Sequence, residues 1–479
     1  MEHLPVFVKV KQRFYQDSLK LMRVSGDIEA LDGIKQAFAF MGTAVNKTTR
    51  IPPEVLTGDA GAAGPDDLIL MVECDDAAIA ASALQEFDKK MTEATVSSAG
   101  SATGEVVPTT LDEGLALSPD AGIAIISVPG QYAAAQAMRA LQLGLSVHMF
   151  SDNVPLEDEI SLKKFALEKG LLFMGPDCGT AIIQGVPLCF ANKLRRGGIG
   201  IIAASGTGAQ EVGCIIDDLG EGVSHIIGVG GRDLSQEVAG LMTLRAIELL
   251  ANDPETKVIA IVSKPPAKSV ADKVLEGVKA AGKPAVLIFM GYEGSDAMYA
   301  PTLETGAKKA VELLTGKSVP PGNCEPIQHS FLPSQTLVRG MYTGGTLASE
   351  AEFLLAQSNI KFEIIDLGDD EYTRGALHPM IDPANRSRMV HEAAKDPTTA
   401  IILCDVVIGY GSHPNPAGEL VKALENTNAC VIASVTGTDA DPQNKGAQER
   451  ILRAAGVHVF PSNQQAVEAA CALMNTHSR

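Results

Sequence analysis

The stretch that decides the fold is Gly198-Ile199-Gly200-Ile201-Ile202-Ala203-Ala204-Ser205-Gly206-Thr207-Gly208-Ala209-Gln210-Glu211. An apolar run, 199–202, ends at a small polar turn, 205–208, and apolar residues at helical spacing follow from Val212 to Leu219. This order predicts a strand, a tight turn and a helix. The turn offers backbone N–H groups and two hydroxyls at the positive end of a helix, which is an anion site and most often a phosphate site.

Two familiar phosphate loops do not fit this turn. No Gly-Lys-Ser/Thr follows it, so it is not the Walker lysine loop, and it lacks the G-x-G-x-x-G spacing of dinucleotide-binding proteins. We expect an anion to be bound by Ser205, Gly206, Thr207 and Gly208 through another scheme. The alternative is an ordinary capped turn between a strand and a helix.

Composition excludes several classes of partner. The net charge of −19 argues against nucleic acid and anionic membrane surfaces, so an anionic substrate must be held by local groups. None of the eight cysteines forms a C-x-x-C pair, the amino terminus has no apolar signal region, and no apolar stretch reaches about 18 residues. We expect a reduced, soluble, cytoplasmic protein.

Continuous apolar strands alternate with helical patterns along most of the chain, which is typical of parallel sheets covered on both faces. We expect an α/β protein with mostly parallel sheets in three layers. The predicted domains are an amino-terminal region at 1–194 with a sub-boundary near 97–113, a domain at 195–318, a linker at 319–335 and a carboxyl-terminal domain at 336–479.

Ligands of open parallel sheets bind at the carboxyl ends of the strands, where this sequence is repeatedly polar and rich in glycine. We expect two or three facing ligand clefts there. Beyond the first turn, the candidate phosphate- or substrate-binding residues are Gly230, Gly231, Gly344, Gly345, Thr346, Gly409, Gly411, Ser412, Thr436 and Gly437, and the candidate catalytic residues are Lys264, Arg232 and His413.

Each charged candidate has a structural alternative. Arg232 and Lys264 could each be an ordinary cation at the surface. Asp177 is better explained as a helix cap, and Cys178 as a packed thiol, than either is as a nucleophile. Asp366, Asp369 and Asp370 are better explained as helix-capping acids than as ligands of a divalent cation, so no metal is expected. His378 and Asp382 have structural or interfacial roles in the same interpretation.

At these strand ends the sequence resembles known proteins. Met174–Gly179, Ser205–Thr207 and Val229–Asp233 resemble turns of succinyl-CoA synthetase α chains, and the order of strand ends from Thr336 resembles the carboxyl-terminal domain of the β chain. Almost the full length resembles the FdrA family of acyl-CoA-synthetase-like proteins. The strings that carry this resemblance are Met149–Val154, Met174–Thr180, Gly230–Ser235, Ser263–Pro266, Tyr342–Leu347 and His378–Pro383.

The resemblance implies a Rossmann-like, CoA-binding-type first unit followed by two flavodoxin-like domains of the succinyl-CoA synthetase type. It places a possible remnant of a CoA site at Ser127, Pro129, Ser151, Asp152 and Asn153, although the glycine-rich CoA loop is absent. The sequence also departs from a true ligase elsewhere. Met290-Gly291-Tyr292-Glu293 stands where the ligase carries its phosphorylated histidine, Lys264 stands where it carries a glutamate, and no nucleotide-grasp domain is present.

FdrA proteins resemble one subunit of a multi-protein carbamoyltransferase of anaerobic allantoin breakdown, which converts oxalurate and phosphate to oxamate and carbamoyl phosphate. The resemblance implies that role here, with phosphate or carbamoyl phosphate as ligand, a small anionic substrate, further subunits as partners and an oligomeric assembly. The alternatives are an acyl-CoA ligase without a phosphohistidine and a non-catalytic metabolite-binding subunit. Phosphate held by the turn at 205–208 would attack the carbamoyl carbon, and Lys264 and Arg232 would neutralise the developing charge.

Overall fold

The computed structural model describes residues 5–477 except 15, 17, 30, 44–45, 48–55, 57, 98–107, 293, 295, 321, 323–325 and 374–376. The chain forms two compact units, Met1–Thr110 with Asp370–His378, and Leu111–Asp369 with Pro379–Arg479. Parts of both predicted linkers, 98–107 and 323–325, lie outside the described residues, as do Glu293 and Ser295. The domain boundaries drawn within the second unit remain predictions.

The first unit contains an antiparallel sheet of order β1-β3-β2, in which β3 pairs with both neighbours. Apolar side chains of β3 are buried on both faces: Leu68, Leu70 and Val72 on one, Ile69 and Met71 on the other. The sequence predicted these strands but not their direction, because a strand buried on both faces has the same apolar pattern in either sheet type. The elements are β1 (Val6–Lys11), α1 (Ser18–Glu29), β2 (Gln36–Met41), α3 (Gly58–Ala62), β3 (Leu68–Glu73), α4 (Ala77–Ser97) and α13 (Asp370–Thr373).

The second unit begins with the predicted parallel βαβαβ segment, a sheet of order β4-β5-β6. A hairpin that the sequence did not predict follows it, β7 (Thr180–Ile183) and β8 (Val186–Cys189), and joins the next sheet beside β10. Its turn has positive φ at Gln184 (52°) and Gly185 (82°), as a two-residue hairpin turn requires. The elements before the hairpin are α5 (Leu111–Leu117), β4 (Ile123–Ile126), α6 (Gly130–Gln142), β5 (Ser146–Met149), α7 (Leu156–Glu168) and β6 (Phe173–Met174).

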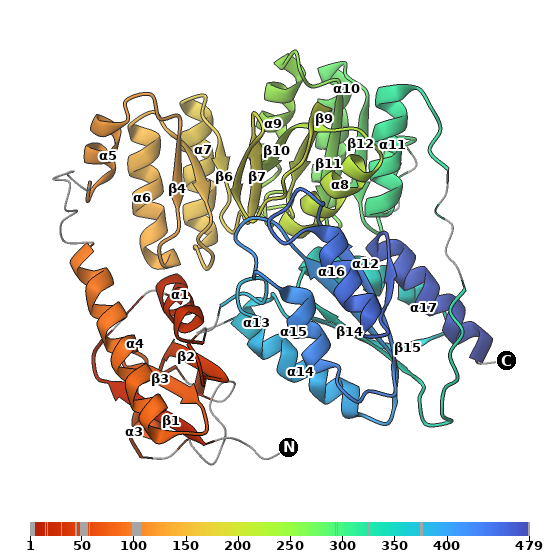
Figure 1. Cartoon of the computed structure of the whole chain (residues 1–479). Helices are drawn as coiled ribbons and strands as arrows, with labels where there is room; N and C mark the ends of the chain where they lie inside the picture. The colour runs from red at the N-terminus through yellow and green to blue at the C-terminus, as the bar shows by residue number, and fades with distance from the viewer. Residues whose placement is uncertain are drawn as a thin grey trace. The chain divides into compact units, whose positions relative to one another are not determined.

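Two larger sheets form the rest of the second unit (Figure 1). The first has the order β13-β12-β11-β9-β10-β7-β8 and the second the order β15-β14-β16-β17-β18. The first contains β9 (Arg196–Ala203), α8 (Gly206–Asp218), β10 (Val223–Gly228), α9 (Leu241–Asn252), β11 (Val258–Ser263), α10 (Lys268–Ala281), β12 (Ala285–Phe289), β13 (Tyr299–Ala300) and α11 (Leu303–Thr315). The second contains β14 (Leu337–Tyr342), α12 (Gly345–Ala356), β15 (Lys361–Asp366), α14 (Ala384–Lys395), β16 (Thr399–Val407), α15 (Pro416–Ala423), β17 (Cys430–Thr436), α16 (Lys445–Ala454), β18 (His458–Phe460) and α17 (Asn463–His477).

Both larger sheets have the flavodoxin-type order, in which the first parallel strand lies between the second and the third. Their central strands are continuous apolar runs, and every residue of β11 and β16 is buried. This confirms the predicted α/β class with mostly parallel sheets. In this topology the ligand crevice lies where the connections diverge, at the carboxyl ends of β9 and β11 in one sheet and of β14 and β16 in the other.

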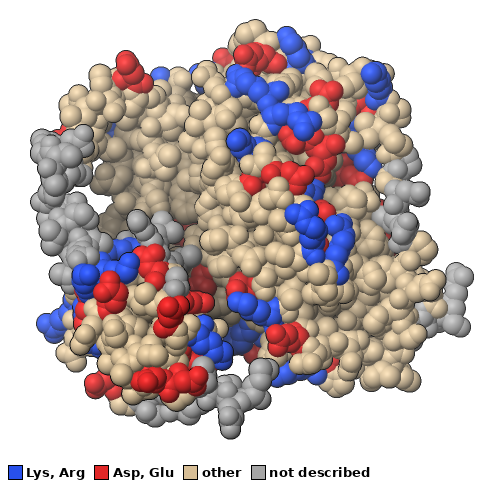
Figure 2. Space-filling view, in the orientation of Figure 1, with Lys and Arg blue, Asp and Glu red and all other residues tan. Residues whose placement is uncertain are grey.

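Among the helices that the structure describes, none is long and apolar enough to cross a membrane. On the face shown in Figure 2, Lys and Arg side chains lie mostly beside Asp and Glu side chains. Ion pairs of the described residues at the surface include Arg453–Glu449 and Lys422–Glu419. Such pairs each contribute little to stability.

Candidate functional site

The turns that open α8 and α12 lie against each other. Ser205 is the N-cap of α8, where its Oγ accepts the N–H of Gly208 at 3.0 Å, and its hydroxyl also shares a hydrogen bond with the hydroxyl of Thr346 in α12. A Cβ on Gly344 would lie 2.9 Å from side-chain atoms of Thr207, so glycine is needed for this approach. The structure therefore brings the two predicted turns, 205–208 and 344–346, into one site.

The start of α8 retains free donors. Gly206 and Thr207 are the first two residues of the helix and are half-buried. The first N–H groups of a helix have no acceptor within it, and no acceptor for these two is found among the described residues. Two N–H groups, the Thr207 hydroxyl and the positive helix end thus remain available to an anion.

The start of α12 is occupied by the protein's own carboxylate. Asp405 is fully buried at the end of β16, and its two oxygens accept the N–H groups of Thr343 at 2.8 Å and Gly344 at 2.7 Å. Arg386 neutralises it, with Nη2 3.0 Å from Oδ1, and also donates to the carbonyl of Met341. Gly344 therefore does not offer its N–H to a ligand, which corrects the prediction for that residue.

Lys264 and Asp366 lie near these two turns, one from each sheet. Lys264 directly follows β11 and is exposed. Asp366 ends β15, and burial raises the pKa of its carboxyl although the charge of Lys264 opposes the rise. A Cβ on Gly345 would lie 2.2 Å from Asp366 Oδ2, so glycine at this position leaves room for the carboxyl at the start of α12.

Arg232 is already paired within the protein. Its Nε lies 2.8 Å from Glu159 Oε2 of α7, and its Nη2 donates to the carbonyl of Val154 at 2.8 Å. Asp233 accepts the N–H of Thr243 at 2.9 Å and caps α9. Arg232 therefore has a structural role that ties the first parallel sheet to the second, and its role in neutralising a substrate stays a prediction.

A buried lysine lies under the same loop. Lys163 is fully buried and contacts Glu159 Oε1 and Asp233 Oδ1 at 2.7 Å each. A Cβ on Gly230, whose φ is +86°, would lie 2.6 Å from the carbonyl oxygen of Pro176, whereas one on Gly231 would meet no atom within 4 Å. Gly230 is therefore needed for the close approach of two backbone segments, whereas the space beside Gly231 is open.

The loop after β16 has used the N–H groups that an anion would need. Gly409 donates to Gln443 Oε1 at 3.1 Å, Ser412 donates to the carbonyl of Gly409 at 3.3 Å, and His413 donates to the carbonyl of Met380 at 2.7 Å. Positive φ angles, 129° at Gly409 and 78° at Gly411, shape the loop against the segment after β8. The predicted second phosphate turn is therefore a packed loop.

The remaining candidates of this sheet are also engaged. Nδ1 of His413 accepts the N–H of Asn415 at 3.1 Å, and burial lowers the pKa of His413. The hydroxyl of Thr436 donates to the buried carboxyl of Glu211. A Cβ on Gly437 would lie 2.1 Å from Ile408, so that glycine serves packing. None of the three is placed with Ser205.

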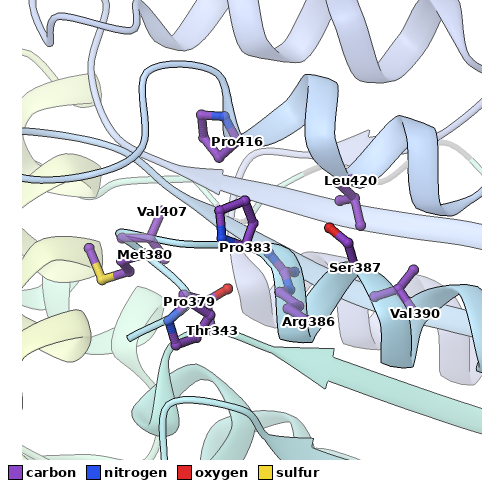
Figure 3. A pocket seen from close by; sticks show the side chains of 10 residues that line it. All are labelled: Thr343, Pro379, Met380, Pro383, Arg386, Ser387, Val390, Val407, Pro416 and Leu420. Carbon is purple, nitrogen blue, oxygen red and sulfur yellow. The ribbon is translucent and has the colours of Figure 1, made fainter. Parts of the chain in front are cut away.

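A small pocket lies beside the α12 turn and contains none of the predicted site residues (Figure 3). Its walls are mainly apolar, including Met380, Val390 and Leu420. The polar lining residues are Thr343, Arg386 and Ser387. Sequence reasoning missed Arg386 and Asp405. The available signal was a charged Asp405 inside an otherwise apolar strand, which requires a buried partner.

Four helices meet in a polar junction that we call the clasp, formed by α8, α11, α12 and α17. Glu211 of α8 accepts the N–H of Asn463 at 3.1 Å and so caps α17, and Glu350 of α12 accepts the N–H of Leu303 at 2.7 Å and so caps α11. Each domain's first helix therefore caps the last helix of the other domain. The clasp fixes how the starts of α8 and α12 face each other.

The clasp is repeated in the sequence. Gly206-Thr207-x-Ala209-x-Glu211 and Gly345-Thr346-x-Ala348-x-Glu350 share the pattern Gly-Thr-x-Ala-x-Glu. The hydroxyl residues that precede α11 and α17 each bond to the other helix. Thr302, before α11, donates to Gln464 of α17 at 2.6 Å, and Ser462, before α17, donates to Glu304 of α11. The two flavodoxin-type domains therefore meet through reciprocal contacts of an approximately two-fold pattern.

Residues at the possible CoA remnant do not suit a pyrophosphate. Ser151 is buried, with Oγ accepting the N–H of Val128 at 3.0 Å, and the carbonyls of Asp152 and Asn153 crowd Gly130 at the start of α6. Ser127 and Pro129 are exposed. These loops contain no Lys or Arg of their own, and the guanidinium beside them, Arg232, is paired with Glu159 and the carbonyl of Val154.

Family comparisons assign three parts of the chain. Residues 2–108 match the model of the AllF heavy metal-associated domain, 195–291 match the CoA binding domain and 341–473 match CoA-ligase. The CoA binding model therefore falls on β9–β12 and not on the possible remnant at 127–153. The residues of the first match do not fit a heavy-metal site, because soft metals are held by several thiolates. Residues 2–108 contain one cysteine, Cys74, which is buried and donates to the carbonyl of Asp76.

The chain is similar to two proteins of known sequence and to one solved structure. YahF of Escherichia coli, described as an uncharacterized protein, is 38% identical over 503 residues, covering 96% of this chain and 97% of that one. The α-2 subunit of the mitochondrial ADP-forming succinate–CoA ligase of Trichomonas vaginalis is 31% identical over 150 residues, covering 30% of this chain and 47% of that one. PH0766 of Pyrococcus horikoshii OT3 aligns in structure with a TM-score of 0.37 and 17% identity, covering 79% of this chain and 88% of that one.

Proposed function

The chain belongs to the same family as YahF of Escherichia coli, and we propose that it is the subunit of a phosphate-dependent enzyme that transfers a carbamoyl or related acyl group. Its scaffold is of the acyl-CoA synthetase and succinyl-CoA ligase type. Within that scaffold we assign it to the FdrA type. The AllF-type domain at 2–108 supports this assignment.

One observation carries the proposal: the open start of α8 faces the start of α12, with Lys264 nearby. Free N–H groups at Gly206 and Thr207, the Thr207 hydroxyl and one ammonium are suited to a phosphate. At the start of α12, Asp405 is already neutralised by Arg386 and Asp366 adds a further carboxyl, so the start of α8 is the favoured end for an anion. We place phosphate there.

Phosphorolysis needs no protein nucleophile. A phosphate oxygen attacks the carbamoyl carbon of oxalurate, the bond from that carbon to the oxamate nitrogen breaks, and a proton goes to this nitrogen. Oxamate and carbamoyl phosphate result. The loop after β12, Met290-Gly291-Tyr292, has no histidine, and this agrees with direct attack by phosphate. The role of Lys264 is to neutralise charge that develops on the phosphate and the carbonyl oxygen.

The chain with its partner subunits is the test system. Oxalurate and phosphate should yield carbamoyl phosphate, measured by coupled conversion to citrulline. Lys264→Ala should lower kcat/KM about 100-fold, since loss of one charge-stabilising donor typically has this effect. Lys268→Ala, an exposed lysine at the start of α10, is the matched control and should leave the rate unchanged. An unchanged rate in Lys264→Ala would remove Lys264 from the mechanism.

The second candidate is an acyl-CoA ligase, favoured by the CoA-ligase and CoA binding matches. It predicts that CoA binds the full chain and raises its melting temperature in a dose-dependent way. No shift at millimolar CoA, together with phosphate-dependent carbamoyl phosphate formation, would reject it. We propose a cytoplasmic, oligomeric assembly in either case.

A further inference from the structure

The starts of α8 and α12 differ chemically, and this difference indicates which substrate fits there. On the α8 side stand N–H groups and the Thr207 hydroxyl, which donate. On the α12 side stands the carboxyl of Asp366, which accepts. Resting on the proposed function, we propose that Asp366 is a specificity residue that selects an N–H-bearing acyl group, such as a carbamoyl or amide group, over a methyl- or carboxylate-bearing one.

The position of the carboxyl supports this role. Oδ1 of Asp366 accepts the N–H of Gly368 at 3.0 Å, while Oδ2 has no donor among the described residues. Oδ2 lies against Gly345, the residue before Thr346, whose hydroxyl is bonded to Ser205. A ligand whose phosphate is held at the start of α8 therefore presents its other end toward a free carboxyl oxygen.

Opposing influences act on the Asp366 carboxyl. Burial raises its pKa, the charge of Lys264 opposes this rise, and Asp369 and Asp405 add to it. Asp405 is itself neutralised by Arg386. An ionised carboxyl accepts a charge-assisted hydrogen bond from an NH₂ group, gives nothing to a methyl group and repels a second carboxylate. The substrate acids of a CoA ligase are carboxylates, so the same residue disfavours ligase chemistry.

Two matched probes test the proposal by titration calorimetry on the full chain. Phosphonoacetamide and acetonylphosphonate share the phosphonate and the carbonyl, and differ only in NH₂ against CH₃. The wild-type chain should bind phosphonoacetamide about ten-fold more tightly, the value of one charge-assisted hydrogen bond. Asp366→Asn should reduce this ratio to about three-fold or less, because the amide retains only a neutral acceptor. Asp369→Asn, which removes a charge from the same loop, should keep the wild-type ratio.

The outcomes separate this inference from the proposed function. If the wild-type chain binds neither phosphonate, the anion site at α8 is refuted and the inference falls with it. If it binds both equally, the anion site stands and the role of Asp366 is refuted. If Asp366→Asn keeps the ten-fold preference, another residue accepts the hydrogen bond from the NH₂ group, and the role of Asp366 is refuted. Equal binding of both phosphonates would be seen with the wild-type chain alone. The role of Asp366 can therefore be refuted even if Asp366→Asn does not fold.

Discussion

The clasp makes a quantitative prediction about pH and stability. Glu350 is fully buried, accepts N–H groups from Leu303 at 2.7 Å and Asn463 at 2.9 Å, and burial raises its pKa to about 7. In the unfolded chain a glutamate titrates near 4.3. The folded state therefore holds a proton on Glu350 between about pH 4.3 and pH 7 that the unfolded state has lost.

The sign of the effect follows from that proton. A group with a raised folded-state pKa stabilises the protein fully below its unfolded pKa, and this contribution is lost as pH rises through the folded pKa. The difference of about 2.7 pKa units corresponds to about 3–4 kcal/mol, an order-of-magnitude value for a buried group. Glu350→Gln mimics the neutral acid and cannot titrate. Its stability relative to wild type should therefore rise by about 3–4 kcal/mol between pH 4.3 and pH 7.

The assay is urea unfolding of wild type and variant at closely spaced pH values, followed by circular dichroism. The difference in unfolding free energy between the two proteins isolates Glu350 from the other titrating groups. Glu352→Gln, an exposed position on the same helix, is the control and should show no pH-dependent difference. A flat difference between Glu350→Gln and wild type over this range would refute the assignment of a buried, protonated Glu350.

Two further variants probe the turn itself. Gly345→Ala should displace the Asp366 carboxyl, which lies 2.2 Å from the added Cβ, and should lower stability by about 1–3 kcal/mol in urea unfolding; a neutral result would mean that the carboxyl moves freely. Arg386→Met should leave the buried Asp405 without its cation and should cost about 3–5 kcal/mol, whereas Arg388→Met on the exposed side of α14 should cost less than about 0.5 kcal/mol. Equal losses in both arginine variants would contradict the buried pair.

Much of the fold was predictable from continuous apolar runs such as Val258–Val262. Such a run is removed from water on all sides when it forms a strand covered on both faces of a sheet. The Ser205 turn was predictable for a similar reason: hydroxyl, glycines and a helix start occur together in the sequence. The hairpin at 180–189 was missed because its strands are four residues each and show no long pattern. The strand directions of the first unit were missed because β3 is buried on both faces. It therefore lacks the alternation of apolar and polar residues that is typical of many antiparallel strands.

The site was less predictable than the fold. Arg232, Gly409 and Thr436 have the residue types of a binding site, but each is used by a partner distant in sequence: Arg232 by Glu159, Gly409 by Gln443 and Thr436 by Glu211. Sequence spacing does not report such partners. A polar residue at a strand end is equally suited to a ligand and to an internal group, and only the surrounding side chains decide between them.

The sequence by itself determined the local elements: the strand, turn and helix around Ser205, the α/β class and the polar carboxyl ends of the strands. These follow from periodicity and residue type over a few neighbours. Only the tertiary structure decided which turns face each other, that Asp405 closes the start of α12 while the start of α8 stays open, and that the charge of Lys264 acts on Asp366. The physical reason is that these facts depend on contacts between segments far apart in the sequence, 141 residues for Ser205 with Thr346 and 61 for Asp405 with Gly344, which no local pattern encodes.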